Sequence, residues 1–462
     1  MTLDILIKNG HIITMDQERT IISRGAIAIE EDRIIDVGKT SDLMKRHKAK
    51  KVIDARNMVV LPGLIDTHIH VYQNFLKGMS DDLPLEPWID KVLIPFGEIM
   101  VEEFRAGKDD VGYFSMLMAG LEMIKSGTTT FASIDTLHRK MGQAIEETGL
   151  RGFYGMQVSD INSPSWAFSK REQWRGVEDI TREWHNKSDG RIRCMMAPTW
   201  IPICSDECYR ISRDFARAHD MRLHTHIGET KAEVEYTTKL FGKRPVRYLH
   251  DIGFLGPDIH AAHCIWLDDR DLDLMAEHDV KVSHNPESNM KLASGVMPMG
   301  KMLQRGMTIA LAADGCASND NLDMIEQMRA AAYIQKLVNL DATSMSARKA
   351  LEMATINGAK ALGMDREIGS IEIDKKADLT MIDMMKPHLQ PINDVIMDLV
   401  YCAWGGDVDT LIVDGKILME KRRVRVINEK ETIKKCIALD KKVKRRIREL
   451  NSAKKAVPKK KD

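Results

Sequence analysis

The feature that most constrains the fold is an alternation of strand-like and helix-like segments between residues 61 and 365. The strand-like segments are short apolar runs, and polar residues follow several of them directly. The expected strands are 128–132, 192–197, 222–227, 259–262, 280–283 and 308–313, and the expected helices are 111–125 and 346–362. Strands that alternate with helices over this length favour an α/β fold, a (β/α)8 barrel of parallel strands. Functional side chains of such a barrel lie at the C-terminal ends of its strands.

Both ends of the chain have a different sequence pattern, which is typical of β-strands. Apolar or β-branched runs are separated there by turn signals at Asn9-Gly10, Glu31-Asp32 and Asp414-Gly415. The expected strands are 3–8, 11–14, 25–30, 33–37 and 51–54 near the N-terminus, and 369–373, 378–382, 408–413 and 416–419 near the C-terminus. We therefore expect one small β-sandwich built from both ends, with residues 1–60 as its first half and residues 366–425 as its second.

Residues 426–462 are rich in lysine and arginine and are expected to form a basic C-terminal helix and tail. The helix should carry an apolar stripe made of Ile433, Ile437, Leu439, Val443, Ile447 and Leu450. We interpret it as a surface helix with a solvated end. A nucleic-acid or membrane role for this segment is the alternative.

The charge balance argues against nucleic acid and acidic membranes as partners. Lys plus Arg and Asp plus Glu both number 68, so the formal net charge is zero and no global field attracts such polyanions. No apolar run reaches the roughly 18 residues that span a bilayer, and residues 1–10 lack the features of a signal peptide. We expect a cytoplasmic protein whose seven cysteines, none in a C-x-x-C pair, are reduced thiols.

Two histidines end the first strand of the expected barrel. His68 and His70 follow an apolar run, and alternate side chains of a strand share one face. Two imidazoles on one face at a strand end are a natural start for a metal site. Two unrelated surface histidines are the alternative, but further strand ends follow the same scheme.

A second pair, His224 and His226, ends the expected strand 222–227. His226 is the better metal ligand because it lies at the end of the run, whereas His224 lies deeper and is expected to orient its neighbours. Glu229 lies three residues beyond His226. A carboxyl group in that place suits general acid/base catalysis.

Three more polar residues follow apolar strands. His263, His284 and Asp314 are each separated from the preceding one by about one strand-helix unit. A lone histidine after an apolar run is usually structural, but five consistent strand ends are hard to attribute to chance. Together they predict a centre for one divalent metal, with His68, His70, His226 and Asp314 as its ligands.

A divalent cation explains why these residue types are needed. It lowers the pKa of bound water from about 16 to about 7, which creates a nucleophile at neutral pH. Asp314 can accept a proton from that water through its second carboxylate oxygen. Some hydrolases on this scaffold hold two metals bridged by a modified lysine at the end of the fourth strand, but the expected fourth strand, 192–197, contains no lysine. One ion is therefore expected, with zinc preferred and iron as the alternative.

Several motifs resemble the amidohydrolase superfamily. They are Pro62-Gly63 before His68-x-His70, His224-x-His226-x-x-Glu229, Ala262-His263-Cys264, Ser283-His284-Asn285-Pro286 with Ser288-Asn289, and Asp314-Gly315 with Ser318-Asn319. The resemblance covers nearly the whole chain, including Ala377-Asp378-Leu379 and Val413-Asp414-Gly415-Lys416. Within the superfamily, the motifs resemble more specifically the branch of triazine hydrolases and S-adenosylhomocysteine/5′-methylthioadenosine deaminases.

Family resemblance implies a role for each position. Glu229 would shuttle protons to a ring nitrogen and to leaving ammonia, and His263 would hold and polarise the hydroxide. Gln73, Trp88, His284, Ser318 and Asn319 would bind the substrate. The implied reaction is attack of water on a ring carbon that carries an amino or another leaving group.

Two departures bear on the substrate. Nucleoside-type deaminases of this branch carry a ribose-binding glutamate and a histidine, whereas the matching positions here are Gly97 and Thr199. Several local runs resemble atrazine chlorohydrolase and melamine deaminase more closely. The chlorohydrolase carries asparagine after its metal aspartate, where this chain has Gly315.

We therefore expect a deaminase that acts on a small aminated nitrogen heterocycle with water. The alternatives are displacement of chloride or an alkylamine from an s-triazine-like ring, and deamination of S-adenosylhomocysteine or 5′-methylthioadenosine. A binding protein on a silent hydrolase fold would lack metal ligands, and none is missing. By analogy with such enzymes we also expect a homo-oligomer.

Overall fold

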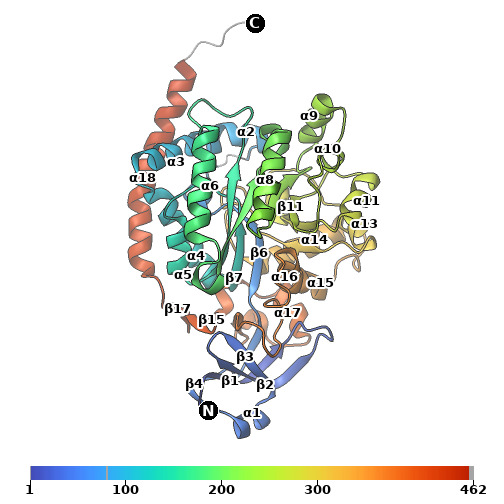
Figure 1. Cartoon of the computed structure of the whole chain (residues 1–462). Helices are drawn as coiled ribbons and strands as arrows, with labels where there is room; N and C mark the ends of the chain where they lie inside the picture. The colour runs from blue at the N-terminus through green and yellow to red at the C-terminus, as the bar shows by residue number, and fades with distance from the viewer. Residues whose placement is uncertain (1, 80–81, 457–462) are drawn as a thin grey trace.

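The structure is a computed structural model that describes residues 2–79 and 82–456. An eight-stranded parallel barrel forms its upper part and a nine-stranded mixed sheet lies below (Figure 1). The barrel strands are β6 (Leu64–Ile69), β7 (Thr128–Ser133), β8 (Arg151–Val158), β9 (Ile192–Pro198), β10 (Leu223–Ile227), β11 (Ile259–His263), β12 (Lys281–His284) and β13 (Ile309–Leu311). The predicted α/β barrel is confirmed.

The barrel strands are hydrogen-bonded in chain order from β6 to β13. Between the last and the first strand, the Thr67 hydroxyl donates to the Leu311 carbonyl over 3.0 Å and the Asp314 N–H donates to the His68 carbonyl over 2.8 Å. The strands are almost entirely buried, which explains their continuous apolar runs. These contacts bring the residues after β13 beside the end of β6.

The connecting segments form helices around the barrel (Figure 1). The longer ones are α3 (Ile94–Ala106), α4 (Asp110–Ser126), α5 (Met141–Thr148), α6 (Lys170–Trp184), α8 (Asp206–Ala218), α9 (Lys231–Phe241), α11 (Asp269–Glu277) and α14 (Met324–Asn339). Shorter ones are η1 (Val71–Leu76), α2 (Leu85–Trp88), η2 (Ile89–Leu93), α7 (Lys187–Gly190), η3 (Ile201–Ile203), α10 (Pro245–Asp251), α12 (Pro286–Lys291), α13 (Met299–Gln304), α15 (Ala347–Met353) and α16 (Ile356–Ala361).

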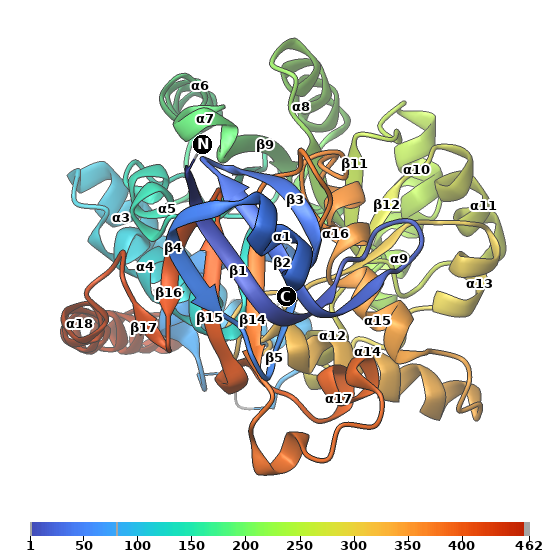
Figure 2. The ribbon, with the colours of Figure 1, turned by 90° about the horizontal axis from the view of Figure 1, so that it is seen from below.

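The mixed sheet is built from both ends of the chain and is seen from below in Figure 2. Its N-terminal strands are β1 (Thr2–Ile13), β2 (Ile21–Glu30), β3 (Arg33–Lys39), β4 (Lys48–Asp54) and β5 (Met58–Pro62), and α1 (Thr40–Arg46) connects β3 to β4. Its C-terminal strands are β14 (Leu379–Asp383), β15 (Val408–Val413), β16 (Lys416–Glu420) and β17 (Arg423–Val424), with η4 (Pro387–Leu389), α17 (Val395–Tyr401) and η5 (Gly405–Asp407) between β14 and β15. β5 and β14 pair antiparallel and join the two halves.

This sheet lies at the N-terminal ends of the barrel strands. The Gly63 N–H donates to the Asp378 carbonyl over 2.9 Å, and the Thr380 hydroxyl donates to the Gly127 carbonyl over 2.7 Å. Inside the junction, the buried Arg151 guanidinium on β8 forms ion pairs with Asp378 and Asp414. The opposite end of the barrel, where the strands end, is left for the functional site.

Four local predictions about secondary structure are wrong. The two strands expected around Asn9-Gly10 form the single strand β1, in which Asn9 has a positive φ of 63° and the pairing with β2 shifts as in a bulge. Residues 369–373 form no strand, since Ile371 makes only an isolated backbone bond to Thr14 in the described chain. The helix expected over 346–362 is broken into α15 and α16 at Thr355.

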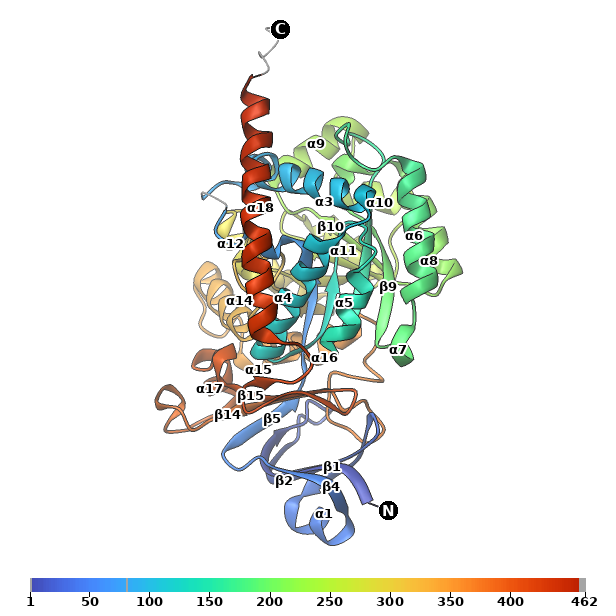
Figure 3. The same ribbon diagram turned by 90° about the vertical axis from the view of Figure 1, so that its left-hand side faces the viewer.

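The fourth error concerns helix α18 (Glu429–Ala456), which packs along α3 and α4 (Figure 3). Its buried face is made by Cys436, Val443 and Ile447, whereas Ile433 and Ile437 of the predicted stripe are exposed. The end of the predicted tail, residues 457–462, lies outside the described residues. Among the described helices, none is long and apolar enough to cross a membrane.

Candidate metal centre and active site

Five polar side chains converge where the barrel strands end. They are His68, His70, His226, His263 and Asp314. His68 Nε2 and His70 Nε2 lie 3.3 and 3.5 Å from Asp314 Oδ1. The Nε2 atoms of His70 and His226 are 3.3 Å apart, and His263 Nε2 lies 4.0 Å from Asp314 Oδ2. The ends of four strands, β6, β10, β11 and β13, thus supply one compact donor cluster.

The other ring nitrogen of each predicted histidine ligand is held by a hydrogen bond. Nδ1 of His70 lies 2.5 Å from the Ile134 carbonyl and Nδ1 of His226 lies 2.8 Å from the Thr199 carbonyl. A carbonyl only accepts, so each Nδ1 carries the proton and each Nε2 presents a lone pair to the centre. This tautomer is the one that a metal ligand needs.

His68 reaches the same state through another histidine. His68 Nδ1 lies 2.7 Å from His224 Nε2, and His224 Nδ1 lies 2.7 Å from the His260 carbonyl. Because His224 must donate to that carbonyl, its Nε2 accepts from His68 Nδ1. His224 therefore orients His68, in agreement with the expectation that it orients its neighbours.

Asp314 is fixed in a strained conformation. Its φ is 66°, in the left-handed region that non-glycine residues rarely adopt. Ser288 donates its hydroxyl to Asp314 Oδ2 over 2.6 Å, and the Gly315 N–H donates to Oδ1 over 2.7 Å. Burial opposes ionisation of Asp314, but His68 and the other imidazoles hold its pKa well below the usual range.

The donor set fits a divalent cation. Burial lowers the pKa of His68 to about 4 and that of His226 well below its usual value, so the rings are neutral and able to ligate. The buried Nε2 atom of His68 has no hydrogen-bond partner among the described residues. Three imidazoles and one carboxylate around a common point suit zinc or iron. The fourth barrel strand, β9, contains no lysine that could bridge a second ion.

Glu229 lies beside this cluster, 3.5 Å from His263 Nε2 through its Oε2 atom. Burial raises the pKa of Glu229 to about 7, and nearby carboxylates add to the shift. The carboxylate of Glu233 accepts the N–H groups of Gly228 and Glu229, which fixes the loop after β10. The side chain of Asn289 holds His263 through Nδ1 at 2.9 Å. A buried carboxyl group with a pKa near 7 can both donate and accept a proton.

A cavity of about 320 Å³ opens onto the cluster. Of the residues predicted to bind substrate, Gln73, Trp88 and Ser318 line it. His284 and Asn319 are buried but do not line it, and the Asn319 amide donates to the Asn321 carbonyl instead. Their roles stay predictions.

Other lining residues were missed in the sequence because no periodic pattern marks them. Trp166 and Trp200 lie in irregular segments after β8 and β9, and Leu93 and Ile94 belong to the helical stretch from η2 to α3. Only the apolar character of these four side chains could have drawn attention to them. They form the apolar part of the cavity wall.

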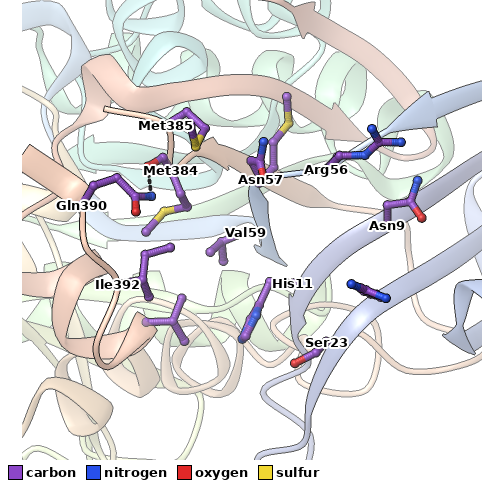
Figure 4. A pocket seen from close by; sticks show the side chains of 13 residues that line it. Asn9, His11, Ser23, Arg56, Asn57, Val59, Met384, Met385, Gln390 and Ile392 are labelled. Carbon is purple, nitrogen blue, oxygen red and sulfur yellow. Dashed lines mark hydrogen bonds between the residues drawn. The ribbon is translucent and has the colours of Figure 1, made fainter. Parts of the chain in front are cut away.

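A second cavity, of about 600 Å³, lies in the mixed sheet and the segment after β14 (Figure 4). His11 is its only imidazole, and Asn9, Arg56, Met384 and Gln390 contribute to its wall. No carboxylate lines it among the described residues. It therefore lacks the donor set and the acid/base pair found at the barrel, and the candidate chemistry belongs to the barrel site alone.

Comparison with models of known protein families shows which family this chain belongs to. The model of the amidohydrolase family matches residues 59–418. The chain belongs to the amidohydrolase family. Members of this family found by sequence include a 5′-deoxyadenosine deaminase of Methanosarcina mazei, 43% identical over 431 residues, which cover 93% of this chain and 96% of the relative. A 5-methylthioadenosine/S-adenosylhomocysteine deaminase of Syntrophobacter fumaroxidans is 38% identical over 432 residues, which cover 94% and 96%.

Solved structures agree with the amidohydrolase fold. An adenosine deaminase from Xanthomonas campestris with bound zinc superposes with a TM-score of 0.89 at 29% identity, covering 97% of this chain and 99% of that one. A triazine hydrolase from Arthrobacter aurescens superposes with a TM-score of 0.87 at 23% identity, covering 94% and 99%. The second likeness shows the fold alone, whereas the family match over residues 59–418 confirms the predicted superfamily.

Proposed function

We propose that this amidohydrolase is a metal-dependent aminohydrolase that removes an amino group from a nitrogen heterocycle. The observation that carries the proposal is the position of Glu229, a buried carboxyl group with a pKa near 7, beside His263 and the donor cluster in one cavity. The names of the related deaminases support the same reaction.

We propose that His68, His70, His226 and Asp314 hold one divalent ion. When bound, such an ion lowers the pKa of a coordinated water to about 7, which makes water a nucleophile at neutral pH. Zinc is preferred over iron because a structural neighbour at 29% identity carries zinc. A homo-oligomeric state and a cytoplasmic location stay predictions.

The remaining steps belong to side chains of this protein. Asp314 is held ionised, so its carboxylate is able to take a proton from the attacking water. Glu229 in its protonated form donates to the ring nitrogen next to the attacked carbon, which withdraws electrons from that carbon. His263 Nε2, 3.5 Å from Glu229, orients the water. After the tetrahedral intermediate forms, the Glu229 carboxylate takes the proton of its hydroxyl group and passes it to the amino group. The C–N bond breaks, ammonia leaves and the hydroxyl becomes a carbonyl, and transfer of the proton held by Asp314 back to Glu229 restores the starting state.

The ring class is proposed from the relatives and from one local contact. Three related proteins are named for deamination of adenine-containing nucleosides, so we propose an aminated purine as the ring. Displacement of chloride from an s-triazine is the second candidate, supported by local sequence likeness. It is disfavoured because this chain has Gly315 where the chlorohydrolase carries asparagine, and the Gln73 side chain occupies the space beside Gly315.

Ammonia release tests the proposed function. The zinc-loaded protein is offered adenosine, 5′-deoxyadenosine, 5′-methylthioadenosine, S-adenosylhomocysteine, melamine and chloro-triazines. We expect ammonia from at least one aminopurine and loss of that ammonia in Glu229→Gln with zinc content unchanged. Chloride or alkylamine release without ammonia would favour the second candidate. Inertness towards every compound with zinc bound would contradict the proposal.

A further inference from the structure

The wall of the active-site cavity away from the donor cluster is almost free of charge. Its apolar side includes Leu85, Trp88, Leu93, Ile94, Trp166 and Trp200. Among the described lining residues, the only carboxylates are Glu229 and Asp314, and no lysine or arginine is present. A substituent of the substrate ring that lies against this wall therefore meets indole and aliphatic surface.

Trp166 is fixed in this wall by helix α3. A Cβ atom at Gly97 of α3 would lie only 3.0 Å from the indole of Trp166, so the ring occupies the space that a side chain at position 97 would take. Arg105 of the same helix donates to the carbonyls of Trp166 and Ala167 over 2.9 and 3.1 Å. The flat aromatic surface is thus built by Gly97 and Trp166 together.

The polar groups of the wall are largely satisfied within the protein. The Asn162 amide donates to the Pro202 carbonyl over 2.8 Å and to the Tyr236 hydroxyl over 3.0 Å, and the Thr199 hydroxyl donates to the Val158 carbonyl. Among the described lining residues, the buried indole N–H groups of Trp88 and Trp200 and the Oε1 atom of Gln73 have no hydrogen-bond partner, and these neutral groups can serve as donors and as an acceptor. A charged substituent would lose its hydration here without gaining an ionic partner.

We propose that this wall selects substrates whose ring substituent is uncharged and mainly apolar, and that Trp166 is the specificity-determining residue. This inference rests on the proposed deaminase function and deepens it. It predicts discrimination between two compounds that share the adenine ring, the ribose and the thioether. These are 5′-methylthioadenosine, which ends in a methyl group, and S-adenosylhomocysteine, which ends in an ammonium and a carboxylate.

The first test compares kcat/KM for these two compounds with the zinc-loaded protein. We expect a preference for 5′-methylthioadenosine of about 10- to 100-fold, as for burial of a polar group without a partner. Equal values, or a preference for S-adenosylhomocysteine, would overturn the inference while leaving the deaminase function intact.

The second test measures binding of the same two compounds to the Glu229→Gln variant, which does not require turnover. Trp88, Trp166 and Trp200 line the cavity, so a ligand should change the tryptophan fluorescence. We expect tighter binding of 5′-methylthioadenosine than of S-adenosylhomocysteine even if the proposed function fails for both. The same affinity for both ligands, or tighter binding of the charged one, would overturn the inference.

The variant Trp166→Ala tests the assigned residue. We expect the ratio of kcat/KM between the two compounds to fall about tenfold, mainly through a higher KM for 5′-methylthioadenosine. Trp404→Ala is the matched control, because Trp404 is half exposed in the segment before η5 and does not line the cavity. An unchanged ratio in Trp166→Ala would contradict the role of Trp166.

Discussion

At the scale of single residues, the site depends on where ring protons lie. His70 and His226 each donate Nδ1–H to a backbone carbonyl, and His68 donates to His224, which donates to the His260 carbonyl. These partners keep every Nε2 lone pair directed at the centre. The hydrogen-bond acceptors of the ligand histidines therefore contribute to metal affinity, in addition to the ligands themselves.

His224→Phe is expected to weaken zinc binding by about 10- to 100-fold, because His68 loses the acceptor that fixes its tautomer. Zinc affinity measured by competition with a chelator checks this. His219→Phe is the matched control, since His219 is exposed on the surface after α8. The account of His224 fails if its variant binds zinc as tightly as the control does.

Glu229→Gln is expected to lower kcat by about 10²- to 10⁴-fold, because the amide can neither give nor take the proton. Zinc content should stay the same, since Glu229 is not a predicted ligand. Glu235→Gln on the exposed face of α9 is the matched control and should keep full activity. Turnover near the normal rate in Glu229→Gln would rule out the proton transfer assigned to it.

The pH dependence follows from the same residues. Burial raises the pKa of Glu229 to about 7, and the reaction needs its protonated form, so kcat/KM should fall as the pH rises through about 7. The imidazoles hold the pKa of Asp314 well below its usual range although burial opposes this, so Asp314 stays ionised in mildly acidic solution. A profile that stays flat up to about pH 9 would contradict this assignment.

The donor residues could be predicted from sequence because strand periodicity places them on one face and at strand ends. His68, His70, His226 and Asp314 are found in this way without knowledge of the tertiary structure. The cavity wall could not be predicted, because Trp166 reaches it from an irregular segment and meets Gly97 only after folding. Periodic segments reveal their buried face, whereas loops do not.

At the scale of elements, the errors arise where tertiary contacts override local pattern. The segment 346–362 has helical character throughout, yet it breaks at Thr355 with φ of −130° and ψ of −96°. A Cβ atom at Gly358 would lie 2.8 Å from Ile65, so α16 packs very closely on β6. This close packing is a tertiary contact that no local periodicity encodes.

Helix α18 offers a comparison within one element. Ile447 is 4% exposed and packs in a cluster with Trp88 and Phe96, whereas Ile437 is 56% exposed. Ile447→Ala should destabilise the docking of α18 by about 2–5 kcal/mol, and Ile437→Ala by less than about 0.5 kcal/mol. Hydrogen exchange of α18 amides measures both. Equal exchange in the two variants would show that α18 does not dock through this face.

At the scale of the whole molecule, the mixed sheet and the metal centre lie at opposite ends of the barrel. The (β/α)8 barrel was predicted from the alternation of strands and helices, and the joining of both chain ends in one β unit was predicted as a small β-sandwich from their β-rich runs. The structure shows the barrel, and it shows that β unit as one nine-stranded mixed sheet. The limits of the four segments, 1–60, 61–365, 366–425 and 426–462, stay a prediction. The sequence alone could not show that Arg151 of β8 joins the two units, because its partners are more than two hundred residues away.

Arg151→Met is expected to destabilise the fold by about 3–5 kcal/mol, because Asp378 and Asp414 would remain buried without their cation. Chemical denaturation followed by circular dichroism measures the loss. Arg24→Met is the control, since Arg24 is exposed and forms no ion pair with another described residue. If both variants unfold at the same denaturant concentration, the junction does not depend on this cluster.

The central claim is that water replaces an amino group at a ring carbon through this centre. Turnover of an aminopurine in ¹⁸O-labelled water, followed by mass spectrometry and ammonia determination, tests it most directly. The account predicts one labelled oxygen in the product for each ammonia released, with both signals lost when a chelator removes the metal. Ammonia without label in the product, or full turnover after metal removal, would contradict it.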